Sequence, residues 1–150
     1  NHTFGTANYG VGDQLAVTDS SASSATKRVK FPVEIGVACS DETSNLTTGT
    51  AKVTFRMPHQ MTVTEVRANV NTAPAGSTIL VDINNGGSPL LSTKLMIDAG
   101  EYTSKTAATP AVISPALNPL ADDAIITVDI DQIGSSTAGK GLKIWLIGYR

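Results

Sequence analysis

Apolar residues recur at every second position along most of this chain. The alternation begins at Val33, Ile35 and Val37 and returns in several later segments. Those segments are Val53–Met57, Ile79–Ile83, Leu91–Ile97, Ile126–Ile130 and Leu142–Leu146. A period of two places side chains on one face of a β-strand, whereas a helix repeats its apolar residues three and four positions apart. The pattern therefore predicts a strand in each segment and no helix of useful length.

The segment 61–71 alternates in two different phases. Met61 and Val63 occupy one phase, and the three apolar residues that follow them occupy the other. One extra residue in a strand shifts the phase by one position, which is what a β-bulge does. We expect a bulge near Thr64 and Glu65 that returns all these side chains to one inward face.

Turn-forming residues separate the expected strands. Asn85–Pro89 contains Asn-Gly, a strong hairpin signal. Further turns are expected at Ala73–Gly76, Asp98–Gly100 and Gly134–Gly141. We expect a short strand at Glu101–Lys105 between them.

Residues 106–124 are expected to form a long crossing loop. Three prolines, Pro110, Pro115 and Pro119, interrupt this segment and cannot donate to a strand ladder. Counted together, the segments give seven or eight short antiparallel strands at roughly even spacing. This arrangement predicts an all-β antiparallel sandwich of jelly-roll type.

The start of the chain differs from the rest. Residues 1–33 are rich in Ser, Thr, Ala and Gly, and they include the low-complexity stretch SSASSAT at 20–26. Such a stretch cannot build a packed core by itself. We therefore predict an extended arm or linker over 1–33 and the sandwich domain over 34–150.

Composition narrows the class of protein further. The chain has 150 residues, of which 13 are Ser and 19 are Thr, and only 16% are charged. Coiled coils and helical bundles need far more Ala, Glu, Lys and Leu. The net charge of −2 has no strong block of either sign, so we expect no binding partner among nucleic acids. No apolar run of about 18 residues predicts membrane insertion.

Catalytic motifs are weak throughout the sequence. Gly134–Lys140 matches most of a phosphate-binding loop, but Gly141 stands where Ser or Thr should be, and a strand pattern follows instead of a helix. His59 lies in an expected turn, and acidic neighbours of Cys39 argue against a reactive thiolate. We predict no catalytic residues and no enzymatic activity.

Carboxylates offer one alternative, a calcium site. Asp129 and Asp131 lie two apart on a predicted strand, Asp82 has a similar setting, and Asp122 and Asp123 precede the strand. Oxygen ligands from such residues could hold calcium. Strand placement alone does not bring them together, so acids that keep an outer sheet face solvated are the simpler interpretation. We expect neither a metal site nor a cofactor, with calcium as the open alternative.

Aromatic residues are few, and two groups stand out as candidate contacts. Tyr102 lies in a loop region where a ring could stack on a sugar. Trp145, Ile147 and Tyr149 are out of phase with Leu142–Leu146, so the last strand is apolar on both faces. A second apolar face needs a cover. We hypothesise that these three residues form a subunit contact, and cover by residues 1–33 of the same chain is the alternative.

Three segments of the chain carry a resemblance to a known family: FRMPHQMTVTEVRANVNTAPAGSTILVDIN (55–84), LLSTKLMIDAGEYTSKTAATPAVI (90–113) and LADDAIITVDIDQIGSSTAGKGLKIWLIGYR (120–150). They contain the turn elements TAPAGS, DAGE and DIDQIG in that order. With these segments, residues 50–150 resemble a C-terminal domain found in tail-fibre and other virion proteins of marine bacteriophages. The resemblance implies a β-sandwich displayed on the virion, often trimeric and without enzymatic activity. The single cysteine suits a particle assembled in the host cytoplasm, so we expect the chain to assemble there with other virion proteins.

Several functions fit these observations. The first hypothesis is a tail-fibre or receptor-binding domain whose loops contact host-cell-surface glycans. The second is a capsid decoration or head-fibre protein anchored by residues 1–33. A carbohydrate-binding module and a filament subunit that exchanges its arm as a donor strand remain further alternatives. The sequence leaves open the position on the virion, the host, the glycan, the number of subunits and the role of Cys39.

Overall fold

The computed structural model describes residues 16–18, 26–28 and 30–150. The chain divides into two compact units, Asn1–Phe31 and Pro32–Arg150. In the first unit, β1 (Ala16–Thr18) pairs antiparallel with β2 (Thr26–Arg28). Most of the predicted arm lies outside the described residues, so its extended form stays a prediction.

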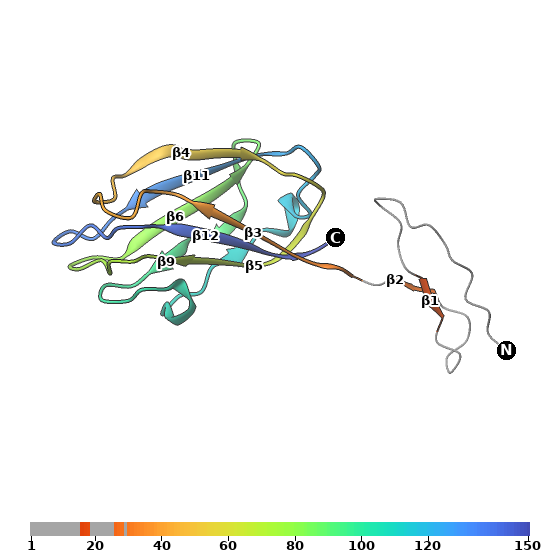
Figure 1. The fold of residues 1–150 in the computed structure, drawn as a ribbon, viewed down its shortest axis with the longest axis horizontal. Helices are drawn as coiled ribbons and strands as arrows, with labels where there is room; N and C mark the ends of the chain where they lie inside the picture. Colours follow the sequence, from red (N-terminus) through yellow and green to blue (C-terminus); the bar gives the residue numbers. More distant parts are fainter. Residues whose placement is uncertain (1–15, 19–25, 29) are drawn as a thin grey trace. The chain divides into compact units, whose positions relative to one another are not determined.

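The second unit is an all-β antiparallel sandwich, as the alternating pattern predicts (Figure 1). Two short 3₁₀ turns, η1 (Ser104–Thr106) and η2 (Pro115–Leu117), are the helical elements of this unit. The strands are β3 (Pro32–Ala38), β4 (Gly49–Arg56), β5 (Thr62–Asn69), β6 (Ile79–Asn85), β7 (Ser88–Pro89), β8 (Leu91–Thr93), β9 (Leu95–Ile97), β10 (Val112–Ile113), β11 (Ile125–Gln132) and β12 (Lys143–Tyr149).

Two main sheets form the layers of the sandwich. One has the order β4-β11-β6, with β7 and β9 both on the far edge of β6. The other has the order β3-β12-β5. Strands β3 to β6 alternate between the sheets, and the first strand of the unit lies beside its last, β12. These features agree with the jelly-roll expectation.

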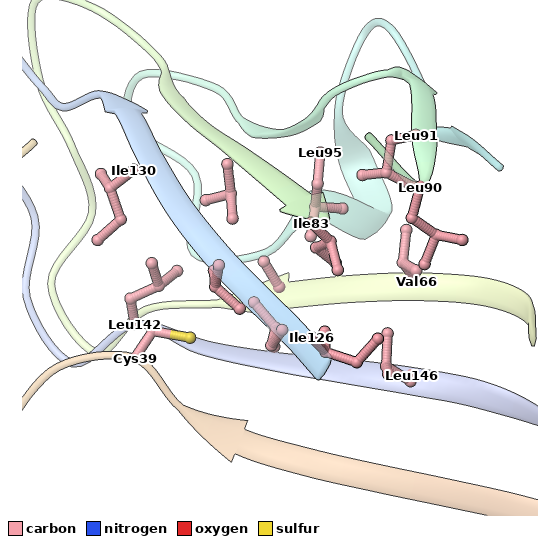
Figure 2. Close-up of a cluster of buried hydrophobic side chains, with 14 of the residues drawn as sticks. Cys39, Val66, Ile83, Leu90, Leu91, Leu95, Ile126, Ile130, Leu142 and Leu146 are labelled. Atoms are coloured by element: carbon pink, nitrogen blue, oxygen red, sulfur yellow. The ribbon is translucent and has the colours of Figure 1, made fainter. Parts of the chain in front are cut away.

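Side chains from the inner faces of both sheets form one hydrophobic core (Figure 2). Ile126, Val128 and Ile130 enter it from β11, while Ile144 and Leu146 enter it from β12. All five are almost completely buried. Their spacing of two residues is the pattern that predicts these strands, so the inner faces of the sheets follow directly from the sequence.

The bulge expected in 61–71 is present. Ile147 on β12 pairs with Glu65, and the next residue, Gly148, pairs with Val63, so Thr64 has no opposite residue. Met61, on the near side of the bulge, therefore points inward together with the apolar residues beyond it. Gly148 lies so close to the Thr62 carbonyl that a side chain there would collide with it.

The hairpin predicted at Asn85–Pro89 is also confirmed. Asn85 pairs with Ser88 across the turn. Gly86 and Gly87 both have positive φ angles, +58° and +84°. Two positive φ angles at the central positions are the signature of a type I′ turn, and glycine adopts them without steric cost.

The strand expected at Glu101–Lys105 is a wrong prediction. Only Thr103 pairs there, in an isolated bridge with Asn69. The Thr103 hydroxyl accepts a hydrogen bond from the Lys105 N–H and starts η1, so the chain turns instead of extending.

The crossing loop expected over 106–124 contains more regular structure than predicted. Val112 and Ile113 form β10, which pairs with β8, and η2 follows. Pro110 and Pro115 both lie outside this two-residue strand. The backbone N–H groups of Val112 and Ile113 are therefore available for pairing with β8. The single strand expected over Leu91–Ile97 is divided as well, because β8 pairs with β10 while β9 pairs with β6.

Candidate functional site

The outer face of the β3-β12-β5 sheet carries an exposed tryptophan at its centre. Trp145 on β12 lies opposite Gly36 on β3 and Arg67 on β5. Trp145 is 39% exposed, whereas the neighbouring Ile144 and Leu146 are buried in the core. The alternation along β12 therefore turns Trp145 outward.

Two neighbouring residues hold the indole ring in place. Gly36 leaves room for it, since a Cβ atom there would come within 2.6 Å of Trp145 Cζ3. On the opposite side, Trp145 Nε1 donates a hydrogen bond to Asn69 Oδ1 at 3.2 Å. A ring positioned by its neighbours loses little conformational entropy when it binds a partner.

Shallow hollows flank the indole on both sides. The larger of these two, the "Trp145 hollow", has a volume of about 330 Å³. Its lining residues are Glu34, Arg67, Ala68, Asn69, Thr103, Trp145 and Ile147. The other, of about 300 Å³, lies on the β3 side and is lined by Gly36, Val37, Ala38, Lys143 and Trp145.

A charged cluster borders the Trp145 hollow on β5. Arg67 binds Glu65 through two hydrogen bonds, Nε to Oε1 at 2.7 Å and Nη2 to Oε2 at 2.9 Å. Lys105 Nζ approaches the same Oε1 at 3.4 Å. The hydrogen bond from Arg67 holds the pKa of Glu65 below its usual range. The carboxylate thus stays ionised and keeps the guanidinium in place beside the tryptophan.

Arg67 also lines a third, larger hollow, which we call the "β5-edge hollow". Its volume is about 560 Å³, and it lies between β5 and the segment 104–118. Glu65 and Lys105 line it too. The charged cluster therefore stands between two hollows on one surface.

The predicted contact residues have different settings. Tyr102 is 58% exposed, but it lines neither the Trp145 hollow nor the β5-edge hollow. Trp145, Ile147 and Tyr149 all lie on the outward phase of β12, and the last two are half-buried. Their role as a subunit contact stays a prediction.

The outward carboxylates form a network that the sequence does not reveal. Asp82 and Asp129 lie opposite each other on β6 and β11. Lys94 Nζ lies 2.6 Å from Asp131 Oδ2 and 3.5 Å from Asp82 Oδ2. Asp82 is buried, so the expectation that it faces solvent is wrong. Lys94 therefore places a positive charge between Asp82 and Asp131, and Asp82 has a further acid, Asp129, opposite it on the sheet.

Calcium binding by these acids stays untested. Asp129 Oδ1 accepts a hydrogen bond from the Ala51 N–H at 2.7 Å, and its Oδ2 accepts one from Asn84 Nδ2 at 3.0 Å. Within the described ranges, no three side chains among His, Cys, Asp and Glu gather where they could share a metal ion.

The structure gives no chemical role to the two remaining candidates, the Gly134–Lys140 segment and Cys39. Residues after Gly134–Lys140 form β12, as predicted, and not the helix that a phosphate-binding loop requires. Cys39 is buried, and desolvation raises the pKa of its thiol to about 11. No helix in the described part of the chain has both the length and the apolar character needed to cross a membrane.

Sequence reasoning missed Gly36, Arg67 and Asn69 as members of the site. They come from β3 and β5, far from Trp145 in the sequence, and only the register of the sheet brings them together. Gly36 carries the one available signal, because a glycine inside an apolar strand often marks a close approach by another group.

Comparison with known proteins does not identify a relative. Searches of protein-family models, of curated proteins and of solved structures find no match to this chain.

Proposed function

We propose that this chain is a non-enzymatic virion structural protein of a bacteriophage, and that its sandwich binds host-cell-surface glycans as a tail-fibre or receptor-binding domain. The resemblance of residues 50–150 to virion proteins supports the first part. The observation that carries the second is the Trp145 indole, exposed and held over Gly36 between two hollows.

The chemistry of the Trp145 hollow suits a sugar ring. One face of a pyranose presents C–H groups that pack on an aromatic ring, while its hydroxyls need donors and acceptors around the rim. Arg67 supplies donors there, Glu34 supplies acceptors, and Thr103 can do both. One positive and one negative side chain give the hollow no net charge, which favours a neutral sugar unit at this position.

A glycan array tests the proposal when the wild-type protein is compared with Trp145→Ala. We expect the wild type to bind a subset of glycans and Trp145→Ala to lose at least tenfold in affinity, because the stacking surface is gone. Tyr102→Ala is the matched control, since it removes another exposed ring that lines neither hollow. Circular dichroism and the melting temperature establish that each variant is folded.

A second variant tests the placement of the ring. Gly36→Ala puts a methyl group against Trp145 Cζ3, so we expect it to displace the indole and to weaken glycan binding as well. Failure of the folded wild type to bind any glycan would contradict the proposal. Unchanged binding by Trp145→Ala would also contradict it, because the ring would then not be the platform.

A subunit contact is the second candidate for the same face. Its support is the outward row Trp145, Ile147 and Tyr149 on β12, which would be covered in a homotrimer. Light scattering on Trp145→Ser distinguishes the two: dissociation of an oligomer would assign the row to the contact. An intact oligomer that no longer binds glycan would assign it to the sugar.

Capsid decoration is the alternative location on the virion. The division of the chain at Phe31 and Pro32 supports it, because a separate first unit could anchor the sandwich to capsid subunits. Cryo-electron microscopy of purified particles decides by copy number. A few trimers at the tail agree with receptor binding, and hundreds of copies on the head would replace it with decoration.

A further inference from the structure

The two main sheets differ at one edge. The sheet containing β6 has β9 and β7 on its far edge, but β5 has no full strand beyond it. The irregular segment 101–120 runs along that edge of β5 instead. It hydrogen-bonds to the edge at four places, through Leu120 to Met61, Asn118 to Val63, Ser104 to Ala68 and Tyr102 to Val70.

Val66 lies in the middle of this edge and faces the β5-edge hollow. The Ala68 N–H donates to Ser104 Oγ and so points away from β12, and Val66 has the same phase on the strand. Its N–H and C=O therefore point toward the segment 101–120, where no described residue hydrogen-bonds to them. The hollow thus offers one backbone donor and one acceptor beside its charged side chains.

A peptide strand cannot extend along this edge. The Asn118 side chain occupies the Val63 N–H and C=O on one side of the gap, and Ser104 occupies the Ala68 N–H on the other. Strand addition needs a run of free backbone groups, and the gap supplies only those of Val66. A small polar group fits this geometry better than a peptide.

The charge of the hollow indicates which polar group. Lys105 and Arg67 face a single carboxylate, Glu65, among the residues that line it. Arg67 also lines the Trp145 hollow together with Glu34, so Lys105 is the cation that belongs to the β5-edge hollow alone. Two guanidinium nitrogens of Arg67 are bound to Glu65, and the third, Nη1, can serve a ligand. Lys105 has an exposed side chain and can donate to an anion as well.

We propose that the β5-edge hollow is a second sugar subsite that binds a carboxylate-bearing unit, so that the glycan recognised by this protein is an acidic oligosaccharide. This inference rests on the proposed function. The sugar on Trp145 and the acidic sugar occupy the two hollows that share Arg67. Lys105, Arg67 and the Val66 N–H bind the carboxylate, and the exposed Val112 forms part of the wall behind it.

Affinity measurements with defined sugars test this proposal. The probes are uronic-acid tetrasaccharides from alginate, pectin and hyaluronan, neutral tetrasaccharides from amylose, cellulose and laminarin, and the corresponding monosaccharides. We expect at least one acidic tetrasaccharide to bind about tenfold more tightly than every neutral one and than its own monosaccharides. Its affinity should fall when salt is raised from 0.05 to 0.5 M, because screening weakens contacts between charges.

Variants separate the two subsites. Lys105→Ala should lower affinity for the acidic tetrasaccharide about tenfold and leave the binding of neutral monosaccharides unchanged, whereas Trp145→Ala should weaken both. Lys52→Ala is the matched control, because Lys52 is exposed, hydrogen-bonds Thr47 and lines neither hollow.

Each outcome has a distinct meaning. Equal affinity for acidic and neutral tetrasaccharides, or an unchanged affinity in Lys105→Ala, would overturn the second subsite while the Trp145 site still stands. Absence of binding to every probe by the folded wild type would overturn the subsite and the proposed function together.

Discussion

Single residues in this protein owe their roles to neighbours distant in the chain. Trp145 is an exposed platform because Gly36 lacks a side chain and Asn69 accepts its N–H. A larger residue at position 36 would occupy the space that the Trp145 ring now fills. Cys39 shows the opposite case, since burial makes a reactive residue type inert.

The Cys39 thiol leads to a prediction about stability at high pH. Burial raises its pKa from 9.0 to about 11 in the folded protein, so the folded state favours the neutral thiol. The resulting stabilisation is complete below pH 9 and is lost as pH rises toward 11, an effect of about 2 kcal/mol. Urea unfolding at several pH values, compared with Cys39→Ala, measures it.

Subtracting the Cys39→Ala curve from the wild-type curve isolates the cysteine, because Tyr and Lys side chains titrate in both proteins. A difference that stays constant between pH 9 and 11 would contradict the prediction. Iodoacetamide should also modify the thiol only slowly at pH 8 unless the protein is unfolded.

At the scale of elements, the outer edge of β5 is completed by side chains. Asn118 accepts from the Val63 N–H at 2.9 Å through Oδ1 and donates to the Val63 carbonyl at 2.8 Å through Nδ2. One amide thus makes both hydrogen bonds that a neighbouring strand would make. Farther along the edge, Ser104 Oγ accepts a hydrogen bond from the Ala68 N–H. These contacts hold the 101–120 segment against the sheet and limit the edge available for pairing with another chain.

Asn118→Ala should therefore destabilise the sandwich. Val63 is buried, and leaving its backbone N–H and C=O unsatisfied costs about 1–3 kcal/mol in unfolding free energy. Chemical denaturation measures the change. Asn45→Ala, at an exposed loop position, is the matched control and should change stability by less than about 0.5 kcal/mol. Equal stability of Asn118→Ala and the wild type would show that water replaces the amide.

At the scale of the whole molecule, the hydrophobic core belongs to one unit. Every buried apolar side chain among the described residues lies between Cys39 and Leu146. The first and last strands of the unit, β3 and β12, pair with each other and close the fold. The second unit therefore contains the contacts that a sandwich needs for independent stability.

Residues 32–150 alone should fold as the full chain does. We expect one cooperative unfolding transition with a midpoint within about 3 °C of that of the full chain, which corresponds to roughly 1 kcal/mol. Scanning calorimetry of both proteins makes the comparison. A much lower midpoint, or loss of cooperativity, would show that residues 1–31 contribute to the stability of the sandwich.

Much of the fold can be predicted from the sequence, because its signals are local. The inward faces of β11 and β12, the type I′ turn at Gly86 and Gly87, and the bulge at Thr64 all follow from the period of two and from the conformational freedom of glycine. The strand expected at Glu101–Lys105 was wrong, because hydrogen bonds of Thr103 and Ser104 to their surroundings outweigh the extended tendency of so short a segment.

The candidate site shows where local signals end. The alternation along β12 by itself determined that Trp145, Ile147 and Tyr149 point away from the core, since side chains of a strand alternate between two faces. Only the tertiary structure decided that Gly36, Arg67 and Asn69 surround the indole, that Lys94 lies between Asp82 and Asp131, and that Tyr102 lies outside both hollows. The physical reason is strand register: which residues face each other across a sheet depends on the packing of the whole sandwich, and no short segment contains that information.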